Sequence, residues 1–182
     1  MKTISDHILD ITENSVRARA TLIEIIVNEN KSTELYRVEL KDNGIGMTNE
    51  EIRKAVQPFF TTRTTRKVGL GLPLLKHNAE QTGGSLKIIS QKSNGTVVTA
   101  DFGLNHIDRP VMGDMAGVFV LSIIGHEGIN FVYSHKTDHG QFSISTFELK
   151  EVLDGVSFRE PEVRKSIKEL IENNLIEIKA SK

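Results

Sequence analysis

Alternating apolar and polar residues mark several short strands in this chain, and these strands come in pairs joined by turns. Residues 35–42, LYRVELKD, alternate as a half-buried strand does, and an expected strand over 22–27 precedes them across a polar turn. Strands expected over 86–90 and 96–102 flank an Asn-Gly dipeptide at 94–95, which is typical of a two-residue hairpin turn. The chain is therefore expected to build a sheet from hairpins.

Helices are expected before and between these strand pairs. The first covers about 4–20, and the second follows Thr48, a cap residue succeeded by acidic residues that favour the positive end of a helix. A third helix is expected over 70–81, closed by two glycines at 83–84. Residues 61–68 contain threonines and basic residues but no apolar period, so this segment is expected to be a loop.

The sequence changes character after the last of these paired strands, and we divide the chain into domains 1–104 and 105–182. Residues 105–114 have the composition of a connector. Two apolar runs in the second domain predict strands over 118–124 and 129–134.

The second domain ends in two expected helices and carries four of the six histidines. A capping box at 145–148 opens a short helix, and Pro161 opens the last one. His135 and His139, together with Asp138, have the side chains of metal ligands. The segment SHKTDHG that contains them is typical of a hairpin loop, so we expect polar loop residues there and no metal.

The composition excludes several classes of protein. The 182 residues carry 23 basic and 24 acidic side chains, a formal net charge of -1 that gives no basic footprint for general nucleic-acid binding. No apolar run approaches the roughly 18–20 residues of a membrane span, and the N-terminus turns polar too early for a secretory signal. The absence of cysteine excludes disulfides, thiolate metal sites and thiol nucleophiles. We expect a cytoplasmic protein without membrane or nucleic-acid partners.

Three polar residues of the first expected helix are spaced to share one face. Asp10, Asn14 and Arg17 stand at positions i, i+4 and i+7. An amide oxygen can bind a hard cation, a guanidinium can meet phosphate, and a carboxylate can order a water or take a proton. The face suits a metal-bound polyphosphate, although a solvated helix surface has the same kinds of residue.

The segment DNGIGM, residues 42–47, follows directly on an expected strand. Glycines at positions 44 and 46 would let the backbone approach a ligand closely. A buried Asp42 could accept a hydrogen bond from an exocyclic amine, which would select adenine over guanine. Hairpin turns have similar sequences, so this segment alone decides little.

Gly69-Leu70-Gly71-Leu72 opens the third expected helix after a loop rich in Thr and Arg. Free amides at a helix N-terminus, with the helix dipole behind them, form an anion site. Arg63, Arg66 and Lys67 lie just before it and could meet phosphate oxygens. The chain has neither a Walker-type P-loop nor a GxGxxG segment after a first strand, so P-loop and Rossmann nucleotide binding do not apply.

Taken in order, these segments resemble the motifs of the GHKL superfamily of ATP-binding proteins. That superfamily includes gyrase-type topoisomerases, the heat-shock-90 chaperone, sensor histidine kinases and mismatch-repair ATPases. HILDITENSVRA resembles the N box, DNGIGM the first glycine box, QPFFTTR the F box and GLGLPLLK the second glycine box, over roughly 4–102. The resemblance implies an α+β fold, a two-layer α/β sandwich of the Bergerat type. Helices would cover one face of a mixed sheet, and a small α+β extension would follow.

The resemblance also implies roles for particular residues. Asn14 would bind Mg²⁺, Asp42 would recognise adenine, and Asp10 lies where family members place a catalytic residue. Lys67-Val68 replaces the family's usual Gly-Thr, so the lid over the nucleotide is expected to lose one flexible hinge. The nucleotide-binding positions implied are Asn14, Arg17, Asp42, Gly44, Gly46, Met47, Arg63, Lys67, Gly69, Leu70, Gly71, Leu72 and Thr96.

In function, the resemblance implies a Mg-ATP-binding regulatory protein of the histidine-kinase-like type. We expect a protein kinase that acts in trans on a separate protein partner. The sequence shows no phosphoacceptor hairpin before the first helix, and His7 on that helix is expected to be structural. An ATP-hydrolysing switch, in which Asp10 activates water, and a nucleotide-gated binding module of the anti-sigma type are the alternatives. The partner's identity, a homodimer and the role of residues 105–182 stay open.

Overall fold

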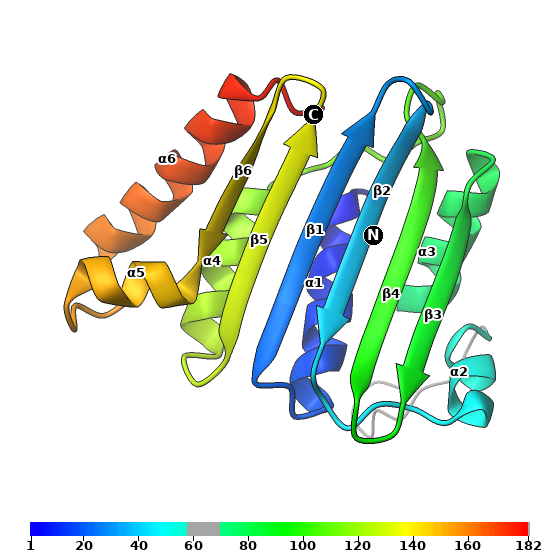
Figure 1. The fold of residues 1–182 in the computed structure, drawn as a ribbon, viewed down its shortest axis with the longest axis horizontal. Coiled ribbons are helices and arrows are strands. Elements are labelled where there is room, and N and C mark those ends of the chain that lie inside the picture. Colours follow the sequence, from blue (N-terminus) through cyan, green and yellow to red (C-terminus); the bar gives the residue numbers. More distant parts are fainter. Residues whose placement is uncertain (58–69, 182) are drawn as a thin grey trace.

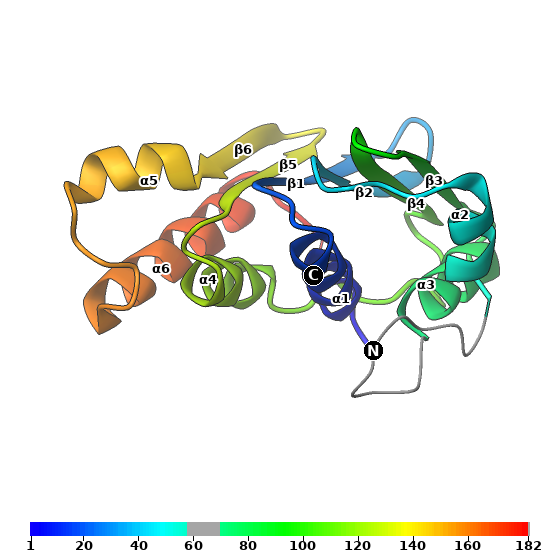
Figure 2. The ribbon, with the colours of Figure 1, turned by 90° about the horizontal axis from the view of Figure 1, so that it is seen from below.

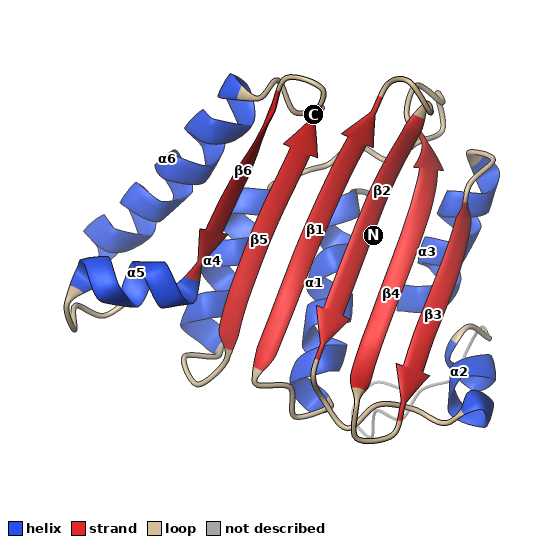
Figure 3. Ribbon diagram, in the orientation of Figure 1, coloured by secondary structure: helices blue, strands red, loops and turns tan. Residues whose placement is uncertain are grey.

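The computed structural model describes residues 1–57 and 70–181, whose elements form two layers (Figures 1 and 2). The elements in chain order are α1 (Ile4–Arg17), β1 (Leu22–Asn30), β2 (Leu35–Asp42), α2 (Asn49–Ala55), α3 (Gly71–Gln81), β3 (Ser85–Gln91), β4 (Gly95–Gly103), α4 (Met115–Gly125), β5 (Asn130–Thr137), β6 (Gly140–Ser145), α5 (Thr146–Leu153) and α6 (Pro161–Glu177). The strands form one sheet in the order β3-β4-β2-β1-β5-β6. Helices α1, α3 and α4 cover one face of it, which confirms the expected α+β sandwich (Figure 3).

Neighbouring strands in this sheet are antiparallel except β1 and β5, which run parallel. Alternate residues of β1 point into the core, so that Ile23, Ile25 and Val27 are fully buried beneath the helices. The register of β2 and β4 pairs Asp42 with Thr96. Two residues that lie far apart in the sequence therefore meet at one end of the sheet.

The predicted strand over 118–124 is wrong, because these residues belong to helix α4. An apolar run without polar alternation fits a buried helix as well as a buried strand. The side chain of Asp114 favours the helix over the strand, because its Oδ1 accepts a hydrogen bond from the backbone N–H of Gly117 (2.8 Å) and caps the helix. The first helix also ends earlier than expected, at Arg17, because Arg19 adopts a left-handed φ of 60°.

The extension after residue 104 continues the same sheet. Strand β5 pairs with β1 from Leu22 opposite Asn130 to Asn28 opposite Lys136, and β6 pairs with β5. The expected short helix and the last helix are both confirmed as α5 and α6. No helix in the described part of the chain combines the length and the apolar character that crossing a membrane requires. The division into domains at residue 104 stays a prediction.

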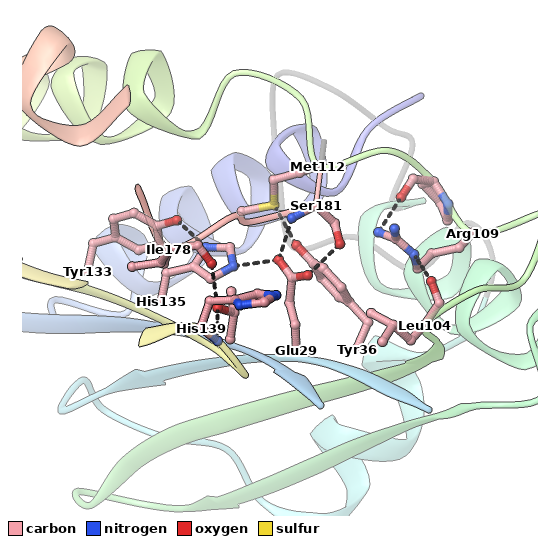
Figure 4. Close-up of polar contacts among 12 residues, drawn as sticks. Glu29, Tyr36, Leu104, Arg109, Met112, Tyr133, His135, His139, Ile178 and Ser181 are labelled. Carbon is pink, nitrogen blue, oxygen red and sulfur yellow. Dashed lines mark hydrogen bonds and ion pairs between the residues drawn. The ribbon is translucent and has the colours of Figure 1, made fainter. Parts of the chain in front are cut away.

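A buried polar network joins β1, β5 and the C-terminal segment (Figure 4). His135, which lies in β5 and not in the predicted loop, bonds through Nε2 to Glu29 Oε1 (2.8 Å) and through Nδ1 to Tyr133 Oη (2.8 Å). The backbone N–H and hydroxyl of Ser181 both donate to the Glu29 carboxylate. Burial alone would raise the pKa of Glu29, but the hydrogen bonds from His135 and Ser181 outweigh it and lower that pKa.

Glu29→Gln is expected to lower the free energy of unfolding by about 2 kcal/mol, because bonds to a buried carboxylate are lost. The folded-state pKa of Glu29 lies below its ordinary 4.5, so its contribution is complete above about pH 4.5. It is lost as the pH falls through the lowered pKa. Chemical denaturation at several pH values measures the difference between wild type and variant.

The matched control is Glu24→Gln on the same strand. Glu24 forms a partly exposed ion pair with Lys41 (3.0 Å), so its removal should change stability by less than about 1 kcal/mol. A Glu29→Gln effect that grows as the pH falls below 4.5 would contradict the network's assignment.

Candidate functional site

A cavity of about 330 Å³ opens between α1, the segment after β2, the start of α3 and the β3–β4 hairpin. Most of the predicted nucleotide-site residues that the structure describes line this cavity. They are Asp10, Asn14, Arg17, Asp42, Gly46, Met47, Leu70, Gly71, Leu72 and Thr96. Gly44 is buried behind the wall, against Ala18. The predicted Arg63, Lys67 and Gly69 lie outside the described residues.

Asp42 is a buried carboxylate in the cavity wall. It is the last residue of β2, only 8% exposed, and both of its oxygens are held by donors. Ser15 Oγ on α1 donates to Asp42 Oδ2 (2.7 Å), and the backbone N–H of Gly44 donates to Oδ1 (2.9 Å). The carboxylate is thus fixed in direction, as a group that recognises one face of a ligand must be.

A pair of hydroxyl groups, those of Ser90 and Thr96, lies near Asp42. Thr96 Oγ1 lies 2.8 Å from Ser90 Oγ, and Ser90 Oγ also accepts from the backbone N–H of Met47 (2.8 Å). These bonds tie the segment after β2 to the hairpin of β3 and β4. Sequence reasoning found Thr96 but missed Ser15 and Ser90, because serines occur in many helices and strands without a role.

The two glycines after β2 allow the chain to pass close to other parts of the protein. A Cβ at Gly44 would lie 2.6 Å from the carbonyl oxygen of Ala18 at the end of α1. Gly46 has a φ of +64°, and a Cβ there would collide with the carbonyl of Gln91. Any side chain at either position would displace the wall of the cavity.

The predicted polar face of α1 points into the cavity. Asp10, Asn14 and Arg17 all line it, and Arg17 donates a hydrogen bond to Asn14 Oδ1. The Asp10 carboxylate contacts Gly71, the first residue of α3. A helix N-terminus, an amide oxygen and a carboxylate thus all line the cavity, which suits phosphate and a hard cation.

An ion pair stands at the rim, between the helix α2 and the β3–β4 turn. Lys92 Nζ lies 2.8 Å from Glu51 Oε2 and also donates to the carbonyl of Gly46 (3.3 Å). The hydrogen bond from Lys92, together with those from Thr48, holds the pKa of Glu51 at about 2. Neither Lys92 nor Glu51 was predicted as a site residue, since only the folded chain brings the two residues together.

His7, which was expected to be structural, is buried between α1 and α3. Its Nε2 lies 3.0 Å from Asn78 Nδ2, and burial lowers the pKa of its imidazole. The side chain is therefore neutral at pH 7 and closed to a protein partner.

The comparisons with known proteins agree with this arrangement. A family model described as "Histidine kinase-, DNA gyrase B-, and HSP90-like ATPase" matches residues 3–106. An NtrY-like sensor histidine kinase of Rickettsia bellii is 33% identical over 94 residues, which cover 52% of this chain and 15% of that protein. Sporulation kinase E of Bacillus subtilis is 36% identical over 74 residues, 41% of this chain and 9% of that kinase. The chain thus spans only a small part of these relatives.

A crystal structure of the N-terminal domain of a DNA repair protein has a similar fold. It matches with a TM-score of 0.56 at 18% identity, over 80% of this chain and 53% of that chain. A match over 80% of the chain must include residues beyond 106, so part of the extension has the same fold as the corresponding part of that domain. Because the family model covers more than half of its residues, the chain belongs to the histidine kinase-, DNA gyrase B- and HSP90-like ATPase family, which implies that it binds ATP.

Proposed function

We propose that this protein binds Mg-ATP and transfers the γ-phosphoryl group to a separate protein partner. The observation that carries the proposal is the cavity itself, which brings a directed carboxylate, Asp42, together with the polar face of α1 and the start of α3. The kinase relatives support phosphoryl transfer as the reaction.

Asp42 would bind the adenine ring. Its carboxylate accepts hydrogen bonds only, so it would pair with the exocyclic amine of adenine and not with the carbonyl oxygen of guanine. The neighbouring Thr96 hydroxyl offers both a donor and an acceptor beside it. Ser15 keeps the carboxylate in place from behind.

Asn14 and Arg17 would hold the phosphate end. The amide oxygen of Asn14 keeps one lone pair beside its bond from Arg17, and an oxygen of this type suits Mg²⁺, which takes few protein ligands when phosphates supply others. When bound, Mg²⁺ would neutralise charge on the phosphate oxygens. Arg17 would orient both the amide and the phosphates.

Asp10 would act as the general base. The partner's nucleophile attacks the γ-phosphorus, the bond from phosphorus to the β–γ bridging oxygen breaks, and ADP leaves. Asp10 takes the proton that the nucleophile releases. The histidine on α1, His7, is buried and bonded to Asn78, which makes it a poor acceptor. The proposal places the acceptor on another protein.

An ATP-hydrolysing switch is the second candidate, with water as the nucleophile that Asp10 activates. The description of the matching family, which names ATPases, supports hydrolysis as the reaction. A binding module that only senses the nucleotide would use the same cavity without Asp10.

Following a label on the γ-phosphate of Mg-ATP separates these functions. With an extract of the source organism, we expect label on a second polypeptide with the wild type and none with Asn14→Ala. Asp10→Ala should still bind ATP but lose at least about a hundredfold in transfer rate. Label released as free phosphate would support the switch, and tight ATP binding without movement of label would contradict both reactions.

Ser15→Ala is expected to weaken ATP binding about tenfold. Without this donor the Asp42 carboxylate can turn away from the base, and ordering it when ATP binds would cost about 1.4 kcal/mol. Isothermal titration calorimetry measures the affinity.

The matched control is Ser122→Ala, which removes another buried helix serine whose Oγ donates to the Val118 carbonyl (2.8 Å). Ser122 does not line the cavity, so its removal should leave ATP affinity unchanged. Equal losses in the two variants would show a general effect on folding and would count against the proposed place of the base.

A further inference from the structure

Among the described residues, Asp10 provides the side-chain atoms that lie nearest to the position of a Cβ on Gly71. A Cβ built on Gly71 would overlap Asp10 Oδ2 and lie 2.9 Å from Asp10 Cγ. Both residues line the cavity, Asp10 from the middle of α1 and Gly71 from the start of α3. The Asp10 carboxylate thus occupies the space that a side chain at position 71 would fill.

This glycine differs from Gly46 in the cavity wall and from Gly44 behind it. At Gly44 and Gly46 an added methyl group would meet backbone carbonyls, which cannot move without displacing an element. At Gly71 it would meet the end of a side chain, which can turn aside. A residue larger than glycine at position 71 would therefore leave the fold in place and move Asp10.

The direction of Asp10 depends strongly on such a contact. An aspartate has two side-chain torsions, and in a helix one of the three χ1 positions is largely excluded by the preceding turn. If a side chain at position 71 blocks the present rotamer of Asp10, the carboxylate must adopt a different rotamer and moves by more than about 1 Å. A misplacement of roughly 1 Å can already slow a reaction a hundredfold.

We propose that Gly71 is a positioning residue that acts through Asp10. Because glycine has no side chain, it leaves room for the Asp10 carboxylate. The proposal rests on the proposed function, in which Asp10 takes a proton. In this role Gly71 positions the Asp10 carboxylate, which is separate from any contact of the Gly71 backbone with phosphate. Loss of the glycine should slow the reaction without a matching loss of ATP affinity.

Gly71→Ala is the first variant to test. ATP affinity, measured by calorimetry, should stay within about threefold of wild type, while the rate of γ-phosphate transfer or release falls about a hundredfold. The matched control is Gly125→Ala at the end of α4, where an added Cβ meets no described atom within 4 Å. The control should leave both quantities unchanged. A Gly71→Ala variant that binds ATP poorly and turns over normally at saturation would overturn the proposal.

A double-variant cycle separates the collision from an effect on phosphate. The Cβ of Asp10 would lie 3.7 Å from the new methyl group, an ordinary contact, so Asp10→Ala removes the collision and Asp10→Asn keeps it. Gly71→Ala should lower the melting temperature by about 3 °C or more in the wild-type and Asp10→Asn backgrounds, and clearly less in Asp10→Ala. In Asp10→Ala it should also cause no further loss of rate. Equal shifts in all three backgrounds would overturn the proposal.

The same cycle distinguishes failure of this inference from failure of the proposed function. A wild type that neither transfers nor releases phosphate would refute the proposed function. The melting temperatures need no activity, so they would still decide whether Gly71 sets the position of Asp10.

Discussion

The hydrogen bond from Ser15 to Asp42 links the two elements on which the cavity depends. Ser15 lies on α1 and Asp42 ends β2. The bond between them therefore restricts the translation of α1 along its axis and its rotation relative to the sheet. Because both groups are buried, loss of the pairing would leave polar atoms without partners, and other registers of α1 are disfavoured. With this register, Asn14 and Asp10 face the cavity.

Close approach of backbone to backbone is the second constraint on the site. The segment after β2 passes between the end of α1 at Ala18 and the hairpin at Gln91, and only glycines fit at positions 44 and 46. The sequence alone suggested that these glycines make room for a ligand. In the structure they first make room for the protein's own chain, and the cavity keeps its shape as a result.

Local signals in the sequence predicted most elements, because caps and alternation depend on neighbouring residues. The helices after Thr48 and Ser145 are examples, since each has a reciprocal capping box. The run over 118–124 was misread because its residues are apolar on every side, which leaves no period to measure. In the site, the helical spacing of Asp10 and Asn14 was enough to place them together. The partners Glu51 and Lys92 were not predictable, because their contact depends on how separate elements pack.

Helix α1 belongs to the cavity on one side and to the extension on the other. The amides of Ile4 and Ser5 at its start donate to the carbonyls of Val111 and Met112 (2.9 and 2.8 Å), and Glu13 pairs with His126 at the end of α4 (3.0 Å). Glu13 directly precedes Asn14, which faces the cavity. Packed elements move as units, so any displacement of α1 would strain these contacts or carry α4 with it. The extension therefore contacts the helix that carries Asp10, Asn14 and Arg17, although the family motifs end before it.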